Sequence, residues 1–382
     1  MKDNRQKLYS LQILRGFAAV WVVFCHLEFL AAHYFQTFLR LRLVDAGHLG
    51  VHLFFVLSGF IIYWIHSADS GNEGAIRSYF LKRITRIYPL LIVLNVIKLA
   101  YMMITGYGVR ADKFDLSSII GSFLLLPTTN NFLIDVTWSL TYEIWFYLGF
   151  GILLLLGKRF LKTVGIVYGL LLILLNLPGE PQLEGMAGFV FNPRILEFLL
   201  GCGFALFLKR PFGKPFLAGI AWGALGLTAV IIGIRGRLDE RLVWLLNCAY
   251  WGIAFGLLLF GGLILEKTVD FSKFKIGILL GDASYSIYLA HSLSLNVLAI
   301  AFKKFVPNPF PTVLLWGLLG CGVLGVVSGI ICYFCIERPF HILFRNWIRD
   351  KSQRHEPREI AQPARSSLLV PSAEKAEMMH SK

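Results

Sequence analysis

Residues 131–156 read NFLIDVTWSLTYEIWFYLGFGILLLL, and this stretch decides the fold class. Its second half is an almost unbroken apolar run, and the whole is longer than the roughly 20 residues that a helix needs to cross a bilayer. One carboxylate, Glu143, lies about twelve residues into it, near the middle of the span. The stretch is therefore predicted to be a transmembrane helix with an ionisable group at its centre.

Nine other stretches have a similar character. Counting this one, the predicted spans are approximately 8–30, 49–66, 88–105, 131–156, 163–178, 192–208, 216–234, 242–264, 279–302 and 312–336. A weaker apolar segment, Leu116 to Pro127, is too short to cross and is predicted to lie at the membrane interface. The sequence thus predicts an all-α polytopic membrane protein with about ten transmembrane helices.

The composition supports this class and excludes others. Hydrophobic residues make up 56% of the 382 residues and charged residues 16%, whereas soluble domains have roughly 45–50% and 25%. So little charge does not cover a soluble surface, which excludes ordinary cytosolic enzymes, disordered proteins and coiled coils. The polar residues near the C-terminus form a separate segment, so we predict a transmembrane domain over 1–345 and a disordered cytoplasmic tail over 346–382.

The positions of the basic residues explain the net charge of +14. With the N-terminus inside the cell, the inner loops carry sixteen Lys and Arg residues and the outer loops nine, which is the expected direction of bias. Both termini are therefore predicted to be cytoplasmic, and the first helix is predicted to be retained rather than cleaved as a signal peptide. The basic clusters carry no nucleic-acid-binding motif, so no nucleic-acid partner is expected.

Ionisable side chains inside predicted spans are informative, since each is costly in lipid unless it is paired or hydrated. Arg15 and His26 share the first span, eleven residues apart. At 100° per residue they differ by about 20° around the axis, so they lie on one face, roughly 16 Å apart along it. Either they belong to one functional face, or they make separate contacts, with Arg15 reaching the inner headgroups.

The second span opens with the block from Gly50 to Phe60, which holds His52 near its outer end and the small pair Ser58-Gly59. Small residues let membrane helices approach closely, and packing is the simpler interpretation of that pair.

Arg83 and Arg86 lie three residues apart before the third span, on one face of a predicted short helix at the cytoplasmic surface. Guanidinium groups bind phosphate oxygens in bidentate fashion, so the pair suits a phosphate-rich ligand. An anchor for lipid headgroups is the alternative interpretation.

Aromatic residues surround Glu143, beginning with Trp138, and extend too deep for an interface belt alone, so a pocket lining fits at least as well. In the ninth span Tyr288 precedes His291, which lies at about the depth of His26. Two histidines at one level would suit a metal, but no third ligand is evident, and the six cysteines lack the spacing of a zinc site. No metal is therefore expected.

Together these pieces resemble the membrane acyltransferase-3 family, the ten-helix O-acetyltransferases that act on sugars of envelope and secreted polysaccharides. The start of the chain is most similar to the branch that acetylates exopolysaccharides. The motifs that carry the resemblance over residues 8 to about 345 are Arg15 with His26, the Gly50 to Phe60 block, Arg83 and Arg86 with Tyr88-Pro89, Trp138-Ser139-Leu140 with Glu143 and Phe146-Tyr147, Tyr285 to His291, and Glu337-Arg338-Pro339.

The resemblance implies transfer of an acetyl group from cytosolic acetyl-CoA to a hydroxyl of a carbohydrate, such as exopolysaccharide or O-antigen, at the bacterial inner membrane. It implies membrane lipids and polysaccharide biosynthesis machinery as partners. It also assigns His26 to catalysis and Arg83 and Arg86 to donor binding, and the residues singled out above complete the predicted site. The predicted catalytic residues are His26, Arg15 and Glu143; those for acetyl-CoA are Arg83, Arg86 and Tyr88; those for the acceptor are His52, Ser58, Trp138, Tyr288 and His291.

The chain departs from the family pattern at two places. His52 stands where relatives commonly have Asp, so a third imidazole is expected beside His26, and the acid–base role of that Asp is in doubt. After Pro89, where relatives often have an aromatic residue, this chain has Leu90-Leu91. The second departure concerns packing more than chemistry.

Two other functions remain open from the residues alone. A secondary transporter or flippase of sugar-lipid precursors would use His26, Glu143 and His291 as a proton relay. A non-catalytic sugar sensor would not need His26. A cytosolic arginine pair favours the enzyme, because an enzyme needs a donor site and a proton-coupled transporter does not.

Overall fold

The computed structural model describes residues 8–69, 71–105, 114–127, 131–177, 183–208, 214–238, 242–344 and 346. The chain divides after His341 into a helical body and a second unit that starts at Ile342. The predicted tail over 346–382 lies, apart from residue 346, outside the described residues.

All regular structure in these ranges is helical. The ten longest α-helices are α1 (Tyr9–Phe35), α3 (Gly50–His66), α4 (Glu73–Thr105), α6 (Trp138–Leu156), α7 (Lys158–Asn176), α9 (Ile195–Leu208), α10 (Pro215–Gly236), α12 (Trp244–Leu265), α14 (Ser284–Phe305) and α15 (Pro311–Cys332). Shorter helices are α2 (Arg42–Asp45), α5 (Leu116–Leu124), α8 (Gly185–Val190) and α13 (Lys275–Asp282). Three 3₁₀ turns (Ala46–Leu49, Asp135–Thr137 and Phe271–Lys273) and the π-helix η4 (Tyr333–Glu337) complete the set.

The predicted class, an all-α polytopic membrane protein, is confirmed. Within the described ranges, nine helices are long and apolar enough to cross a membrane. The fifth predicted span coincides with α7, whose apolar part, Phe160–Asn176, is shorter than the others. The segment predicted to lie at the interface forms the nine-residue helix α5. The cytoplasmic placement of the termini stays a prediction.

The prediction for the arginine pair was wrong in one respect. Arg83 and Arg86 do not lie on a separate short helix before the third span, because α4 runs without interruption from Glu73 to Thr105. Pro89 lies inside this helix, although it has no N–H to donate to the preceding turn. Both arginines therefore lie in the first half of a membrane helix. Their side chains line a pocket inside the bundle.

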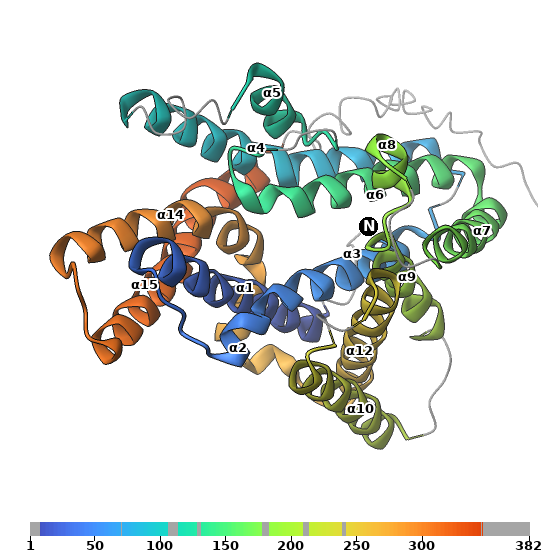
Figure 1. Ribbon diagram of the computed structural model, residues 1–382. Coiled ribbons are helices and arrows are strands. Elements are labelled where there is room, and N and C mark those ends of the chain that lie inside the picture. The colour runs from blue at the N-terminus through green and yellow to red at the C-terminus, as the bar shows by residue number, and fades with distance from the viewer. Residues whose placement is uncertain are drawn as a thin grey trace, which may run out of the picture. The chain divides into compact units, whose positions relative to one another are not determined.

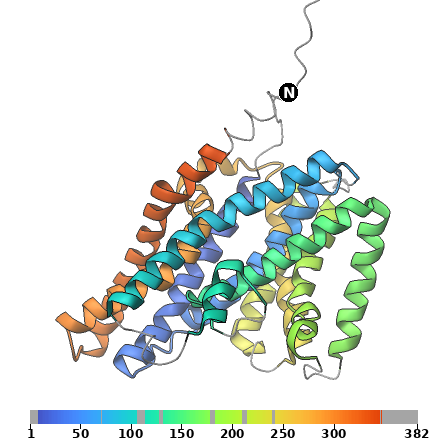
Figure 2. The same ribbon diagram turned by 90° about the horizontal axis from the view of Figure 1, so that it is seen from above.

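Helix α1 lies at the centre of the helical body. It contacts α3 on one side and α13, α14 and α15 on another. Helices α4 and α6 lie side by side across this central group, and α9, α10 and α12 pack beyond α3 (Figures 1 and 2). The space enclosed by α1, α3, α4, α6 and α14 holds the site described below.

Close packing of α3 against α9 depends on glycine. A Cβ atom added at Gly59 would lie 2.0 Å from the carbonyl oxygen of Phe198, and one at Gly201 would lie 2.1 Å from that of Val56. Gly59 therefore confirms the packing interpretation of the Ser58-Gly59 pair, while Ser58 faces the enclosed space instead.

Candidate active site

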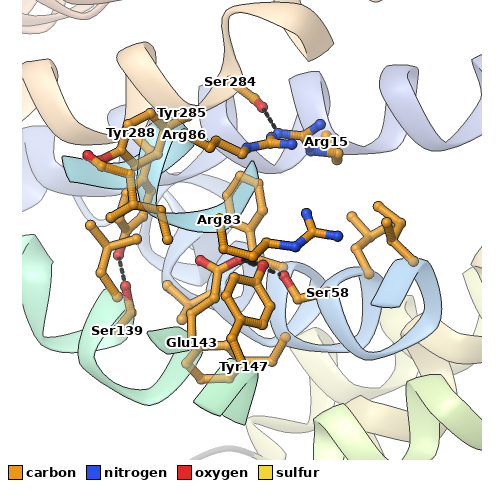
Figure 3. A pocket seen from close by; sticks show the side chains of 17 residues that line it. Arg15, Ser58, Arg83, Arg86, Ser139, Glu143, Tyr147, Ser284, Tyr285 and Tyr288 are labelled. Atoms are coloured by element: carbon orange, nitrogen blue, oxygen red, sulfur yellow. Dashed lines mark hydrogen bonds between the residues drawn. The ribbon is translucent and has the colours of Figure 1, made fainter. Parts of the chain in front are cut away.

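A pocket lies between α1, α3, α4, α6 and α14 (Figure 3). Six predicted site residues line it, from five helices: Arg15, Ser58, Arg83, Arg86, Glu143 and Tyr288. The lining also includes Ser139, Tyr147, Ser284 and Tyr285, which the sequence analysis did not assign to the site.

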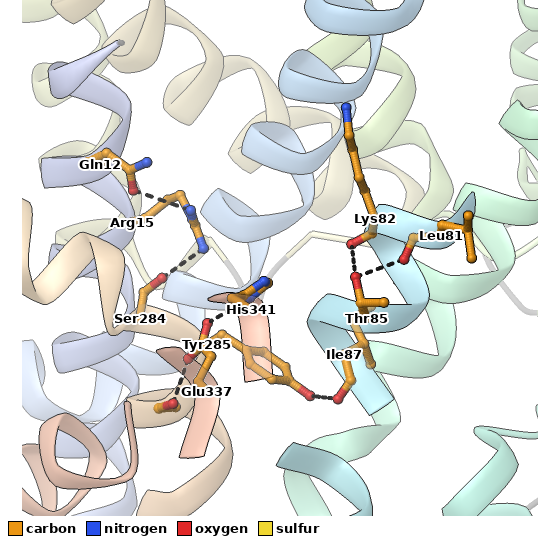
Figure 4. A network of polar contacts seen from close by, with 11 residues as sticks. Gln12, Arg15, Leu81, Lys82, Thr85, Ile87, Ser284, Tyr285, Glu337 and His341 are labelled. Carbon is orange, nitrogen blue, oxygen red and sulfur yellow. Dashed lines mark hydrogen bonds and ion pairs between the residues drawn. The ribbon is translucent and has the colours of Figure 1, made fainter. Parts of the chain in front are cut away.

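Three arginines give the pocket an excess of positive charge. Arg15 donates to Ser284 Oγ over 2.9 Å and to Gln12 Oε1 over 3.3 Å, and its charge interacts with that of Arg86 (Figures 3 and 4). Among the described residues, no carboxylate oxygen lies within 4.0 Å of Arg15, Arg83 or Arg86. Three cations against the single carboxylate of Glu143 favour an anionic ligand.

Arg83 is held by a histidine that the sequence analysis missed. His66, only 3% exposed at the end of α3, places Nε2 3.4 Å from Arg83 Nη2 and Nδ1 2.9 Å from Asp69 Oδ2. The guanidinium also lies over the ring of Tyr147, 5.3 Å from its centroid. Within the described part of the chain, its buried Nε has no hydrogen-bond partner. The sequence places His66 near the end of a predicted span, and nothing in that position indicates its contact with Arg83.

A second acidic residue, Glu337, lies near Arg15 and outside the pocket lining. Glu337, 5% exposed at the end of the π-helix η4, accepts from Ser286 Oγ over 2.5 Å and lies 3.8 Å from His341 Nε2 (Figure 4). Its charge acts on Arg15 without a direct ion pair. Helix α14 also connects to α4, because Tyr285 Oη donates to the carbonyl of Ile87 over 2.6 Å, next to Arg86. These contacts fix the end of the pocket where α1 begins.

Glu143 is a hydrogen-bond acceptor inside the pocket. Its Oε1 accepts from Ser58 Oγ over 2.9 Å and from the hydroxyl of Tyr147. Tyr147 lies four residues later, on the same face of α6, and this spacing was the signal that would have found it. Within the described ranges no histidine hydrogen-bonds Glu143, so of the two roles open to it, orienting a histidine or holding an acceptor hydroxyl, the contacts favour the second.

Tyr288 separates the pocket from a pair of histidines. Its hydroxyl lies 2.6 Å from Ser139 Oγ and donates to the carbonyl of Val136 over 3.1 Å, which connects α14 to the start of α6. The centroid of its ring lies 5.9 Å from that of His291. Tyr288 therefore contacts both regions.

The rings of His26 and His291 meet edge to face, with centroids 4.7 Å apart. In each, Nδ1 faces the carbonyl oxygen four residues earlier in its own helix, at 2.9 Å for Val22 and 3.1 Å for Ile287. A carbonyl only accepts, so both Nδ1 atoms carry the proton and both Nε2 atoms keep a lone pair. His291 is fully buried and, among the described residues, its Nε2 has no partner, whereas His26 is partly exposed.

The shared face of Arg15 and His26 is confirmed, because both residues meet α14: Arg15 at Ser284 and His26 at His291. In the described part of the chain, no group of three or more His, Cys, Asp or Glu residues has a geometry suited to a metal ion.

Three predicted site residues lie outside the pocket lining and the histidine pair. His52 Nδ1 lies 2.5 Å from Glu197 Oε1, so the expected third imidazole is paired with a fully buried carboxylate that needs a partner. Trp138 lies under the guanidinium of Arg194, 4.5 Å from its ring centroid. Tyr88 donates to Leu124 O over 3.5 Å. It follows Arg86 by two residues, which turns it about 200° around α4 and away from the pocket.

The fold and the pocket together define an integral membrane protein with an ionisable site inside its helical bundle. Residues 8–334 match the family model of the acyltransferase domain, Acyl_transf_3, and the chain belongs to this family. It is therefore a membrane acyltransferase.

Two relatives match most of the chain. One is the exopolysaccharide production protein ExoZ of Rhizobium meliloti (strain 1021), 27% identical over 309 residues, which cover 77% of this chain and 89% of ExoZ. The other is the O-acetyltransferase OatA of Staphylococcus aureus (strain NCTC 8325 / PS 47), 24% identical over 323 residues. That match covers 75% of this chain and about half of OatA, 51%. No solved structure matches the fold significantly.

Proposed function

We propose that this protein moves an acetyl group from acetyl-CoA to a hydroxyl of a cell-envelope or secreted carbohydrate, at the bacterial inner membrane. The relatives named for exopolysaccharide production and for O-acetyl transfer support this assignment. The observation that carries it is the placement of two chemically different regions on either side of Tyr288: a cationic pocket and a histidine pair.

The cationic pocket suits the donor. Coenzyme A carries several phosphate charges, and Arg15, Arg83 and Arg86 present guanidinium groups to one space without a carboxylate partner in the described ranges. Charge-assisted hydrogen bonds of this kind are shorter and stronger than neutral ones. With the predicted topology, this end of the bundle faces the cytoplasm, where the donor is found.

The histidine pair suits the acceptor. With Nδ1 turned to the Val22 carbonyl, the Nε2 lone pair of His26 can accept the proton of an acceptor hydroxyl. The hydroxyl oxygen then bonds to the acetyl carbon, the carbon–sulfur bond breaks, and the sulfur leaves as thiolate. The proton held by His26 returns to that sulfur, which balances the reaction.

Two measurements test the proposal. Purified protein in nanodiscs, given radiolabelled acetyl-CoA and de-O-acetylated polysaccharide from the producing strain, is expected to label the polysaccharide. Mass spectrometry of polysaccharide from a deletion strain is expected to show the loss of O-acetyl groups at normal polymer yield. A normal O-acetyl content with a reduced yield would instead identify a transporter or flippase.

A further inference from the structure

A second pocket lies at the opposite end of α1 from the arginines. It has a volume of about 670 Å³. Its walls are the end of α1 with the segment that follows it, Lys303 near the end of α14, and the loop into α15. Its lining mixes aromatic rings with hydrogen-bonding groups. The aromatic residues are Tyr34, Phe35 and Phe38, and the polar ones are Gln36, Thr37, Lys303, Asn308 and Thr312.

Hydrogen bonds within the protein hold the wall formed by α1 and the segment that follows it, without any ligand. Both carboxylate oxygens of Glu28 accept from the backbone N–H of Leu39, at 3.1 and 3.2 Å, which folds this segment back onto α1. Tyr34 Oη donates to Asn296 Oδ1 over 3.0 Å, and Lys303 Nζ donates to the Tyr34 carbonyl over 2.5 Å. Two connections therefore join α1 to α14 at the pocket.

The loop that forms the other wall is stiff as well. Pro307, Pro309 and Pro311 line the pocket, and each has a fixed φ angle. A pocket whose walls are held without a ligand loses little conformational entropy when it binds one.

The pocket's place in the fold connects it to the histidine pair. It lies at the ends of the two helices that carry His26 and His291. From His26 to Phe35 is nine residues of α1, or about 14 Å along the axis. This is longer than one sugar ring, so a molecule that occupies the pocket and also reaches His26 contains several sugar residues.

We propose that this second pocket binds the acceptor saccharide several residues away from the hydroxyl that receives the acetyl group. The proposal rests on the proposed function for the reaction itself. Sugar rings offer apolar C–H faces to aromatic side chains, and hydroxyls to amide and hydroxyl groups, and the lining supplies both. Among the described lining residues Lys303 is the one charged side chain, which suits a neutral or weakly acidic saccharide better than a phosphate group. The acceptor is therefore an oligosaccharide or polymer rather than a single sugar.

The test compares acceptors of different length in two exposed-phenylalanine variants. The probe is de-O-acetylated polysaccharide of the producing strain, cut by mild acid and sized into fragments from one sugar upward. Phe38 lines the pocket and is 64% exposed, so Phe38→Ala removes little packing. Phe310→Ala is the matched control, because Phe310 is 79% exposed in the nearby loop and is not part of the lining.

For the wild type, KM is expected to fall as the fragments become longer. Phe38→Ala is expected to raise KM about three- to tenfold for the long fragments, with kcat and the single-sugar KM unchanged, since one aromatic contact is lost. Equal KM values for one sugar and for long fragments in the wild type, or equal values for Phe38→Ala and Phe310→Ala, would overturn the proposal.

A binding measurement separates this proposal from the proposed function. His26→Ala protein in nanodiscs is immobilised, and the same fragments are passed over it in surface plasmon resonance. Affinity that rises with fragment length and falls with Phe38→Ala supports the saccharide pocket even if no acetyl transfer is found. Transfer without length-dependent binding would support the reaction and refute the pocket.

Discussion

Arg83 Nη2 lies 3.4 Å from Nε2 of His66, whose Nδ1 lies 2.9 Å from Asp69 Oδ2. A carboxylate only accepts, so His66 Nδ1 carries the proton and Nε2 accepts from the guanidinium. An acid in the loop after α3 thus orients an arginine of α4 through a buried histidine. Asp69 and His66 are positioning residues for the proposed donor site.

We predict that Asp69→Ala weakens acetyl-CoA binding about three- to tenfold, because it removes a hydrogen bond to a buried group that holds Arg83. Calorimetry on the purified protein measures the affinity, and kcat at saturating donor is expected to stay unchanged. The control is a double-mutant cycle: in an Arg83→Ala background, Asp69→Ala should have no further effect. Additive losses would show that Asp69 acts elsewhere.

Arg83→Ala and Arg86→Ala are each predicted to weaken acetyl-CoA binding by about one to two orders of magnitude, the value of a lost charge-assisted contact. Arg77→Ala is the matched control, since Arg77 lies exposed on the same helix and outside the pocket. Its affinity should equal that of the wild type. If all three folded variants bind acetyl-CoA equally well, the alternative interpretation, that the arginines anchor the helix at lipid headgroups, would be favoured.

The sequence was sufficient for features that depend on one helix at a time. Long apolar runs predicted the helices, and the 100° rotation per residue placed Arg15 and His26 on one face, which the contacts of both with α14 confirm. Tyr147 was within reach of the same reasoning, because it follows Glu143 by four residues.

Features that depend on which helices are neighbours were not predictable in this way. Spacing along α3 does not show that His52 meets Glu197 on α9, or that His66 meets Arg83 on α4. Tyr88 was assigned through its place in a motif next to Arg86, although the helical rotation turns it to another face. Such contacts come from helix packing, which is set by shape and by small residues at interfaces.

Gly59 supplies a prediction about stability. Gly59→Ala places a methyl group against the backbone carbonyl of Phe198, so α3 and α9 must separate. Overpacking of this kind typically costs about 1–3 kcal/mol, and the melting temperature in detergent should fall. Gly203→Ala on α9 is the control, because nothing lies within 4 Å of a Cβ there. Equal melting temperatures for the two variants would contradict the packing.

Glu143→Gln separates a chemical role from a structural one. The amide keeps an oxygen that accepts from Ser58 and Tyr147 but removes the one negative charge of the pocket lining. We predict normal expression, unweakened acetyl-CoA binding and loss of most acetyl transfer, measured with saturating donor. If Glu143 only joins helices, the glutamine variant will remain largely active.

His26→Ala is predicted to lower acetyl transfer by about 10²–10⁴-fold, the usual contribution of a positioned base, with acetyl-CoA affinity unchanged. His48→Ala, at an exposed histidine outside the pocket lining, should leave the rate unaltered. A folded His26→Ala protein with a near-normal rate would exclude His26 from the chemistry and strengthen the sensor or transporter interpretations.

Under the proposed function, His26 either removes the hydroxyl proton or carries the acetyl group itself, since an Nε2 lone pair permits both. A trapping experiment decides between them: the protein is incubated with labelled acetyl-CoA without acceptor, quenched, and digested. We predict an unlabelled His26 peptide, because a base acts only when the acceptor hydroxyl is present. Label on His26 would refute direct transfer. If His26 does become labelled, the trap is repeated with the His291→Asn variant. Loss of the label from His26 in that variant would show that the two imidazoles act together.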